Sequence, residues 1–185
     1  MSIAAVVLAA GEGVRFEGPG HKLLAPFGDS TVVGTAVDVA LTASLDETIV
    51  VEGAVALDDQ VPSSVTLVRN ERWADGMASS LHIGCALAAA HGHDVVVVGL
   101  GDQPGITTES WKAVAAIDAA IAVATYDGAR GHPVRLRSDV WPLLPIHGDV
   151  GARAVMRLRP DLVREVPCRG VPADIDTRED LEGWS

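Results

Sequence analysis

The stretch HDVVVVGLGDQP, residues 93–104, decides the fold. Its four consecutive valines, Val95–Val98, lack the apolar–polar alternation of a half-exposed strand and are typical of a central parallel strand covered on both faces. We expect a strand over Asp94–Leu100, followed by a loop that carries Asp102. Ligands in open parallel sheets bind beyond the carboxyl ends of the strands, so this loop is a candidate binding site.

Further strands are predicted on both sides of this one. The runs that are short, rich in Val and Ile and bounded by turn residues are Ile3–Leu8, Glu47–Val51, Val65–Val68 and Ala122–Thr125. The pattern is less regular in the C-terminal third of the chain. There we expect an edge strand over His132–Leu136 and another strand over Leu162–Val166.

Helical patterns fill the intervals between the predicted strands. Apolar residues at helical spacing predict one helix from Val33 to Leu41 with a cap at Ser30 or Thr31, one from Met77 to Ala88, and one begun by Thr107 that includes Val114, Ile117 and Ile121. We expect two more helices, over Gly151–Arg159 and after a capping box formed by Thr177 and Asp180. This alternation predicts a three-layer α/β/α sandwich with a mostly parallel sheet, in one domain spanning residues 1–185.

The composition narrows the class of protein. The chain has 14 Lys and Arg against 25 Asp and Glu, a net charge of −11, which argues against a nucleic-acid-binding protein and requires that a few well-placed cations hold any phosphorylated substrate. Cys85 and Cys168 match no metal or redox spacing, as expected of reduced thiols. No segment has the roughly 20 apolar residues that cross a bilayer. The apolar run Ile3–Ala10 lacks a basic region before it, so we expect a buried strand and a cytoplasmic protein.

The first candidate loop, LAAGEGVRF, runs from Leu8 to Phe16 and follows the first predicted strand. A glycine loop at that place presents backbone N–H groups to a phosphate. It is not a dinucleotide fingerprint, because Phe16 stands where the third glycine would be, and no P-loop Lys-Ser/Thr follows. Arg15 and Lys22 add two cations, which suits a nucleoside triphosphate and its departing pyrophosphate. The alternative is a tight turn with two solvated cations.

The second candidate loop carries a carboxylate suited to a metal. Asp102 is a hard oxygen ligand of the kind Mg²⁺ uses together with substrate phosphates, Gly101 leaves room for a ligand, and Pro104 stiffens the exit. The alternative is a turn in which Asp102 caps a bend. Asp174 and Asp176 alternate along an extended segment, so at most one of them can meet a metal at Asp102. Alternatively, Asp176 favours the positive start of the helix that follows it.

A third string, NERWADGMASSL at residues 70–81, places polar groups at the start of a helix. Gly76, Ser79 and Ser80 would offer hydroxyls and free N–H groups to a base or a ribose. Simple N-capping is the alternative and accounts for one of the two serines.

Two later strings, GARGHPV at 128–134 and GDVGAR at 148–153, complete the set. We interpret His132 as an acid–base group or a hydrogen-bond partner of the substrate, with a structural histidine as the alternative. Asp149 and Arg153 are either ligand contacts or a helix cap and a solvated charge.

Together these strings resemble the MobA-like nucleotidyltransferase family, and within it most closely the molybdenum cofactor cytidylyltransferases. The resemblance rests on six strings that occur in the family's order and span nearly the whole chain: LAAGEGVRF with Lys22, NERWADGMASSL, GDQP, DGARGHPV, GDVGAR and DIDTREDL. LAAG rather than LAGG at Leu8–Gly11, together with GDQP, favours the cytidylyl over the guanylyl enzymes. The link between Arg15 and Lys22 is longer than the family's Met-Gly-x-x-Lys link and contains the acidic Glu17.

The resemblance implies a Rossmann-like nucleotide-diphospho-sugar transferase (GT-A-like) fold and an enzyme that uses Mg²⁺. It makes Arg15, Lys22 and Asp102 catalytic, and gives Mg²⁺ the ligands Asp102 and Asp176, with Asp174 as the alternative. The implied nucleotide-binding residues are Leu8, Ala9, Ala10, Gly11, Gly13, Arg15, Lys22, Asn70, Gly76, Ser79, Ser80 and Leu81. The implied acceptor-binding residues are Gln103, Pro104, His132, Asp149 and Arg153.

The implied reaction moves CMP from CTP to the terminal phosphate of a molybdopterin-type cofactor and releases pyrophosphate. The implied protein partner is a molybdenum hydroxylase, and no nucleic acid or membrane partner is expected. Within this class the alternatives are GTP as the donor, or another phosphorylated acceptor such as a sugar 1-phosphate. An alternative of another class is a non-catalytic nucleotide-binding partner of a molybdenum hydroxylase. The presence of Arg15, Lys22 and Asp102 argues against it.

Overall fold

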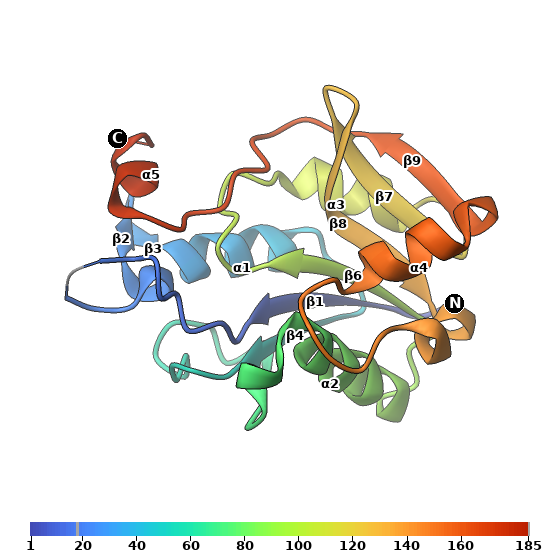
Figure 1. Cartoon of the computed structure of the whole chain (residues 1–185), viewed down its shortest axis with the longest axis horizontal. Coiled ribbons are helices and arrows are strands. Elements are labelled where there is room, and N and C mark those ends of the chain that lie inside the picture. The colour runs from blue at the N-terminus through green and yellow to red at the C-terminus, as the bar shows by residue number, and fades with distance from the viewer. Residues whose placement is uncertain (18, 185) are drawn as a thin grey trace.

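A seven-stranded sheet forms the centre of the computed structural model, which describes residues 1–17 and 19–184 (Figure 1). In the order β5-β4-β1-β6-β8-β7-β9, the strands are β5 (Thr66–Arg69), β4 (Glu47–Glu52), β1 (Ile3–Ala9), β6 (Val95–Leu100), β8 (Ala129–Arg137), β7 (Ile121–Tyr126) and β9 (Val163–Pro167). β8 runs antiparallel to β6 and β7, whereas the other neighbouring strands are parallel. The predicted α/β fold with a mostly parallel sheet is confirmed.

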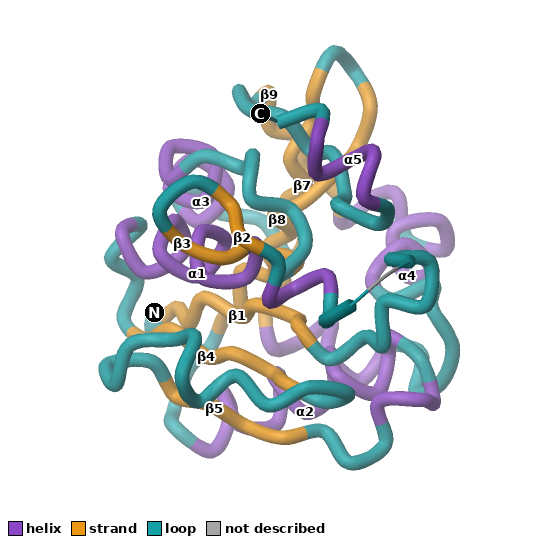
Figure 2. Tube along the Cα trace, turned by 90° about the vertical axis from the view of Figure 1, so that its left-hand side faces the viewer, coloured by secondary structure: helices purple, strands orange, loops and turns teal. Residues whose placement is uncertain are grey.

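Helices cover both faces of this sheet and complete the three layers (Figures 1 and 2). On one face α1 (Val32–Thr42) and α3 (Thr108–Ala115) bury residues such as Val37 and Trp111. On the other face α2 (Met77–Ala90) and α4 (Ala152–Leu158) bury residues such as Leu81 and Val155. The smaller elements are β2 (Pro26–Phe27), β3 (Ser30–Thr31), α5 (Arg178–Glu182) and the 3-10 turns η1 (Lys22–Leu24), η2 (Trp73–Asp75), η3 (Ser138–Leu143) and η4 (Pro160–Leu162).

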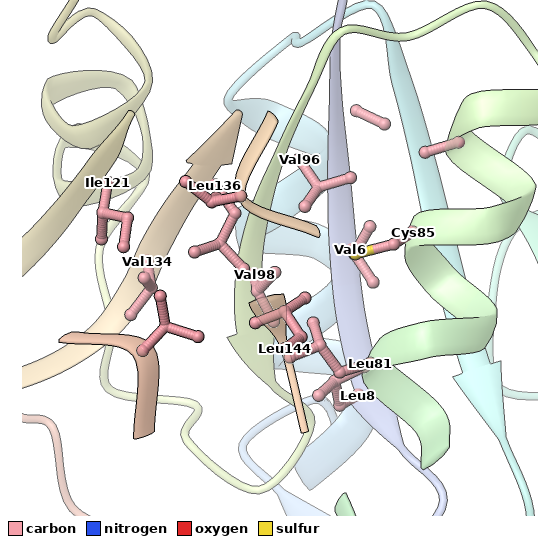
Figure 3. Close-up of a cluster of buried hydrophobic side chains, with 14 of the residues drawn as sticks. Val6, Leu8, Leu81, Cys85, Val96, Val98, Ile121, Val134, Leu136 and Leu144 are labelled. Carbon is pink, nitrogen blue, oxygen red and sulfur yellow. The ribbon is translucent and has the colours of Figure 1, made fainter. Parts of the chain in front are cut away.

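The valine run behaves as the sequence predicts. Val6 of β1 and Val98 of β6 belong to the core cluster on the α2 side of the sheet, where Cys85 of α2 lies beside Val6 (Figure 3). Val7 and Val97, one position away, face the opposite layer. Because successive side chains point to opposite faces of a strand, a strand covered on both sides carries no polar alternation. The central strands therefore end in a rigid edge from which the functional loops begin.

Two predicted placements are wrong. His132–Leu136 belongs to β8, which lies inside the sheet, while β5 and β9 form its edges. Edge position depends on pairing between distant segments, and the polar Arg135 in this strand is nonetheless buried, with its guanidinium donating to the carbonyl of Ala119. The third helical stripe is too long, because α3 ends at Ala115 and Ile121 begins β7.

The predicted helix starts are confirmed in more detail. Thr31, rather than Ser30, caps α1 by accepting a hydrogen bond from the backbone N–H of Gly34. Thr177 and Asp180 form the capping box that opens α5. Within the described ranges, the structure contains no helix long and apolar enough to cross a membrane.

Candidate active site

Three segments meet at the carboxyl ends of β1 and β6. The loop after β1 leads to Lys22 at the start of η1, and the turn after β6 carries Asp102. The segment that precedes α5 lies beside this turn, because the backbone N–H of Ile175 donates to the carbonyl oxygen of Asp102 at 2.9 Å. Ile175 is itself fully buried. This contact brings Asp176, which is far along the chain from Asp102, to the loops after β1 and β6.

Lys22 joins the two carboxylates. Its Nζ lies 2.6 Å from Oδ2 of Asp102 and 2.7 Å from Oδ1 of Asp176. The side chain of Lys22 is only 9% exposed, so this is a buried ion cluster rather than a surface pair. Arg15, whose side chain is 71% exposed, adds a second cation 2.8 Å from the other oxygen of Asp176. The four side chains that the resemblance links to phosphate and metal thus lie together.

Burial and charge set the protonation of this cluster. Burial alone would lower the pKa of Lys22, but its ion pairs with Asp102 and Asp176 outweigh burial and raise that pKa. Burial raises the pKa of Asp102, and the neighbouring charges of Asp174 and Asp176 act in the same direction, against the opposing effect of Lys22. Negative charge is therefore in excess around one buried ammonium, which favours the binding of further positive charge.

The donor set fits a divalent ion that is shared with a substrate. Asp102 and Asp176 place two hard oxygen ligands around one point, as Mg²⁺ sites completed by phosphates and water do. Among residues 1–17 and 19–184 there is no group of three or more His, Cys, Asp or Glu side chains that could hold a metal ion. Asp102 and Asp176 therefore fit an ion held by two carboxylates together with a ligand.

Asp174 and Asp176 have different partners, as their alternation predicts. Oδ1 of Asp174 accepts a hydrogen bond from Nε2 of Gln103 at 2.7 Å, whereas Asp176 contacts Lys22 and Arg15. Of the two, Asp176 is therefore the carboxylate that the structure brings to Lys22.

The glycine loop is braced against Lys22. Gly13 adopts a left-handed backbone conformation with φ of 68°, and a Cβ there would lie 3.0 Å from Cγ of Lys22. Nε2 of His21 lies 3.0 Å from the carbonyl oxygen of Gly11, and its Nδ1 accepts a hydrogen bond from the backbone N–H of Leu23. Burial lowers the pKa of His21. The longer link before Lys22 is thus tied back to the loop through one imidazole.

Arg178 is a candidate functional residue that the sequence interpretation missed. Its Nε donates to the carbonyl oxygen of Glu17 at 2.6 Å, and its guanidinium lies 5.5 Å from the ring centroid of Phe16. Arg178 therefore ties the loop after β1 to the segment that carries Asp176. A sequence signal existed, because an arginine in the first turn of a helix is disfavoured by the helix dipole and calls for another partner.

The string from Asn70 to Leu81 forms an internal network. Nδ2 of the fully buried Asn70 donates to Oγ of Ser79 at 2.8 Å and to Oγ of Ser80 at 2.9 Å. Gly76, at φ of 98°, packs so closely on Gly148 that a Cβ would lie 2.7 Å from its carbonyl oxygen. The N-cap of α2 is Gly76. Neither serine is therefore an N-cap, and the alternative interpretation of these residues as simple caps is wrong. The side chain of Leu81 is buried in the core.

Asp149 caps α2 instead, from 72 positions away. Its Oδ1 accepts a hydrogen bond from the backbone N–H of Met77 at 3.0 Å. Asp149 is therefore a helix cap, as one of the two interpretations of the sequence proposed, and the helix that it caps is α2. The same residue also lines a cavity.

This cavity, of about 380 Å³, lies between α4 and the sheet. Its apolar lining includes Met77, Leu100, Val123, Val134 and Met156, and its polar lining includes Gln103, Arg130, His132, Asp149, Arg153, Arg157 and Asp174. Four of the five residues implied to bind the acceptor are present, and Pro104 is not. Pro104 is buried beside the cavity-lining Gln103.

His132 is an uncharged group in this cavity at neutral pH. Burial, assisted by the positive charge of Arg153, lowers the pKa of His132 to about 4. Asp174 lines the cavity two residues before Asp176, and its charge also acts on Asp102. The cavity therefore adjoins the segment that carries part of the ion cluster.

Comparison with known proteins relates this arrangement to a family. The profile described as "MobA-like NTP transferase domain" matches residues 5–165. The nicotine blue oxidoreductase of Paenarthrobacter nicotinovorans is 33% identical over an alignment 195 positions long, which covers 97% of this chain and 94% of that protein.

Solved structures share the fold over nearly their whole length. A nucleotidyl transferase from Methanothermobacter has a TM-score of 0.83 at 25% identity, with 98% of this chain and 95% of that chain covered. Rv0371c from Mycobacterium tuberculosis has a TM-score of 0.81 at 33% identity, with 99% and 96% covered. A second structure of Rv0371c, at 31% identity and a TM-score of 0.76 with 100% and 98% covered, is a complex with manganese. The predicted GT-A-like nucleotidyltransferase fold is thus confirmed, and a divalent metal has a precedent in a relative.

Proposed function

The chain belongs to the family of MobA-like NTP transferase domains, and on this premise we propose that it is a Mg²⁺-dependent cytidylyltransferase. In this proposal it transfers CMP from CTP to the terminal phosphate of a molybdopterin-type cofactor and releases pyrophosphate, with residues 1–185 acting as one nucleotidyltransferase domain. The observation that carries the proposal is the meeting of Asp102 and Asp176 at Lys22, beside Arg15 and the glycine loop.

The reaction needs no nucleophile from the protein. An oxygen of the acceptor phosphate attacks the α-phosphorus of the nucleotide in line, a new P–O bond forms, and the bond to the β-phosphate oxygen breaks. The obstacle is repulsion between anions, which positioned positive charge relieves. Mg²⁺ between Asp102 and Asp176 would supply part of that charge. Arg15 and Lys22 would neutralise the leaving pyrophosphate, together with backbone N–H groups of the loop Gly11–Gly13.

The cavity beside α4 is the proposed acceptor site. Its apolar surface suits a flat ring system, and its three arginines, Arg130, Arg153 and Arg157, suit an anion in a chain of net charge −11. His132 would donate or accept a hydrogen bond without adding charge. We further propose that Leu8–Ala10 contacts the nucleotide and that the network of Asn70 with Ser79 and Ser80 keeps the start of α2 in place for it.

Other donors and acceptors remain as alternatives within this class. GTP in place of CTP, or a different phosphorylated acceptor such as a sugar 1-phosphate, would use the same carboxylates and cations. The alternative of a non-catalytic nucleotide-binding partner of a molybdenum hydroxylase would not require Arg15, Lys22, Asp102 and Asp176 to be kept together. Their retention as one cluster favours an enzyme.

A redox reaction in the same cavity is a second candidate. The observation that favours it is the relative named nicotine blue oxidoreductase, at 33% identity over 97% of this chain. Reduction of a dye such as nicotine blue, with two electrons taken from a dissolved reduced nicotinamide or flavin co-substrate, would use the apolar cavity but would not need the two carboxylates. Substitution of Asp102 therefore separates the two candidates.

The test is a donor panel. Purified protein is incubated with Mg²⁺, molybdopterin-type cofactor and CTP, GTP, ATP or UTP in turn, and released pyrophosphate is measured. We expect release with CTP and its loss in Asp102→Asn. Preference for GTP would overturn the cytidylyl assignment and keep the site. Tight CTP binding without pyrophosphate would favour the non-catalytic alternative, and Asp102→Asn activity near that of the unmodified protein would overturn the assignment of Asp102.

A further inference from the structure

Lys22 lies where a divalent ion would have to lie. An ion held by both Oδ2 of Asp102 and Oδ1 of Asp176 would need the space that the ammonium of Lys22 fills, since Nζ is hydrogen-bonded to both atoms, at 2.6 Å and 2.7 Å. Metal–oxygen bonds of Mg²⁺ are shorter still, at about 2.1 Å. Two cations cannot share that space, so one must leave for the other to enter.

We propose that Lys22 is the resident cation of the metal site: it neutralises Asp102 and Asp176 in the nucleotide-free protein and moves to the triphosphate when the divalent ion arrives. Metal and nucleotide would then bind together, each weakly without the other. This inference rests on the proposed function, because it takes a nucleoside triphosphate as the anion that receives the ammonium.

The buried carboxylates explain why a resident cation is needed. The side chains of Asp102 and Asp176 are only 20% and 18% exposed. An uncompensated buried charge is strongly destabilising, so a chain without a bound ion needs a cation of its own at this point. Lys22 meets that need from within the fold.

In this proposal the ammonium leaves by rotation of the Lys22 side chain, while the backbone stays in place. Its residue belongs to η1, which is held by the contacts of His21 to Gly11 and Leu23. Its stem lies against Gly13, the glycine of the loop proposed to hold the phosphates. A lysine carries its charge on four rotatable carbons, so rotation of the side chain is enough to exchange one anion for another.

Arg15 supports the same exchange from the surface. It contacts Oδ2 of Asp176, while Lys22 contacts Oδ1. The two cations thus contact the two oxygens of the Asp176 carboxylate. A bound triphosphate would offer new anionic partners to Arg15 and to Lys22. By linkage, the factor by which nucleotide tightens metal binding must equal the factor by which metal tightens nucleotide binding.

The chain offers a matched control, because Lys22 and Lys112 are its two lysines. Lys112 is exposed on α3, away from the ion cluster. We would measure Mn²⁺ binding by electron paramagnetic resonance of the free ion, with and without CTP, in the unmodified protein, Lys22→Met and Lys112→Met. In Lys22→Met we expect Mn²⁺ alone to bind at least tenfold more tightly, and CTP to add less than threefold. The unmodified protein and Lys112→Met should bind Mn²⁺ weakly alone and at least tenfold more tightly with CTP.

Equal or weaker Mn²⁺ binding by Lys22→Met without nucleotide would overturn the exchange. If Mn²⁺ and nucleotide bind together in the unmodified protein but the lysine variant behaves identically, the proposed function stands and the exchange fails. If Mn²⁺ binds to no form, even with each of the four nucleotides, both fail.

A second measurement needs no variant of Lys22. With ¹³C-labelled lysine the unmodified protein gives two Cε signals, and Lys112→Met assigns them. We expect the Lys22 signal to shift with Mg²⁺ and CTP together, and not with Mg²⁺ alone at the same concentration. An unchanged Lys22 signal in protein saturated with both would contradict the exchange.

Discussion

Asp102 and Asp176 accept hydrogen bonds from one atom, Nζ of Lys22. In the sequence Asp102 precedes strands β7 and β8, whereas Asp176 follows them. Each comes from a different part of the molecule, one from the turn after β6 and the other from the segment before α5. The fold therefore brings two carboxylates to a single cation, so both should be needed for the reaction.

Removal of either carboxylate should slow transfer strongly while sparing the fold. We expect Asp102→Asn and Asp176→Asn to reduce kcat on the order of 10²- to 10³-fold, as loss of a positioned electrostatic contact does. Asp174→Asn is the matched control, since Asp174 contacts Gln103 in the cavity. It should raise KM for the acceptor and weaken Mn²⁺ binding much less than Asp176→Asn does, because Asp174 acts on Asp102 only through its charge. Loss of Mn²⁺ binding in Asp174→Asn but not in Asp176→Asn would exchange the roles of the two residues.

Arg178 should act on the nucleotide through the loop that it holds. Arg178→Gln removes its hydrogen bond to the carbonyl of Glu17 and its contact with Phe16. With hydrogen bonds worth about 1 kcal/mol each, we expect KM for the nucleotide to rise about threefold to tenfold, and kcat to change less. Arg159→Gln, which breaks only a surface pair with Asp161, should change neither constant. An equal effect of both variants would show that Arg178 has no positioning role.

Gly13 should tolerate no side chain, for two separable reasons. Gly13→Ala places a Cβ in a left-handed conformation and 3.0 Å from Cγ of Lys22, whereas Gly92→Ala meets the same backbone strain at φ of 84° with no atom within 4 Å. Both should lower the free energy of unfolding by about 1 kcal/mol. Only Gly13→Ala should also weaken binding of nucleotide with metal, which calorimetry would measure. Unchanged binding in Gly13→Ala would contradict the close packing of the loop on Lys22.

His132 should make the protein less stable in acid. Its pKa is lowered to about 4, whereas the pKa of a histidine in the unfolded chain is about 6.5. Between these values the unfolded chain binds the extra proton, so the free energy of unfolding falls as the pH drops from about 6.5 to 4, by up to about 3 kcal/mol. His132→Gln should lose less stability over this window in urea unfolding, and His147→Gln, at an exposed position, should match the unmodified protein. Identical pH profiles for all three would rule out His132 as the cause.

The sequence predicts what depends on local pattern. The run Val95–Val98 identifies a strand buried on both faces, and the alternation of Asp174 with Asp176 predicts that they take different partners, which they do. Thr177 and Asp180 form the predicted capping box. These features depend on residues within a few positions of one another.

Features that depend on contacts between distant residues could not be predicted from the sequence. The inner position of β8 follows from its pairing with β6 and β7, which no single segment encodes. The role of Asp149 as a cap for α2 depends on a contact across 72 positions. The link from Arg178 to the loop spans 161 positions. The sequence therefore identified the chemical groups of the site, and the fold decided which of them touch.

The segment that carries Ile175 and Asp176 contributes no strand to the seven-stranded sheet. A protease that cut after Pro172 would therefore leave every strand of the main sheet in the trimmed protein, while it removed one of the two acids that face Lys22. Such a preparation would pass a circular dichroism check and fail an activity assay. The mass of the intact chain, rather than its circular dichroism spectrum, is consequently the right quality criterion for this protein.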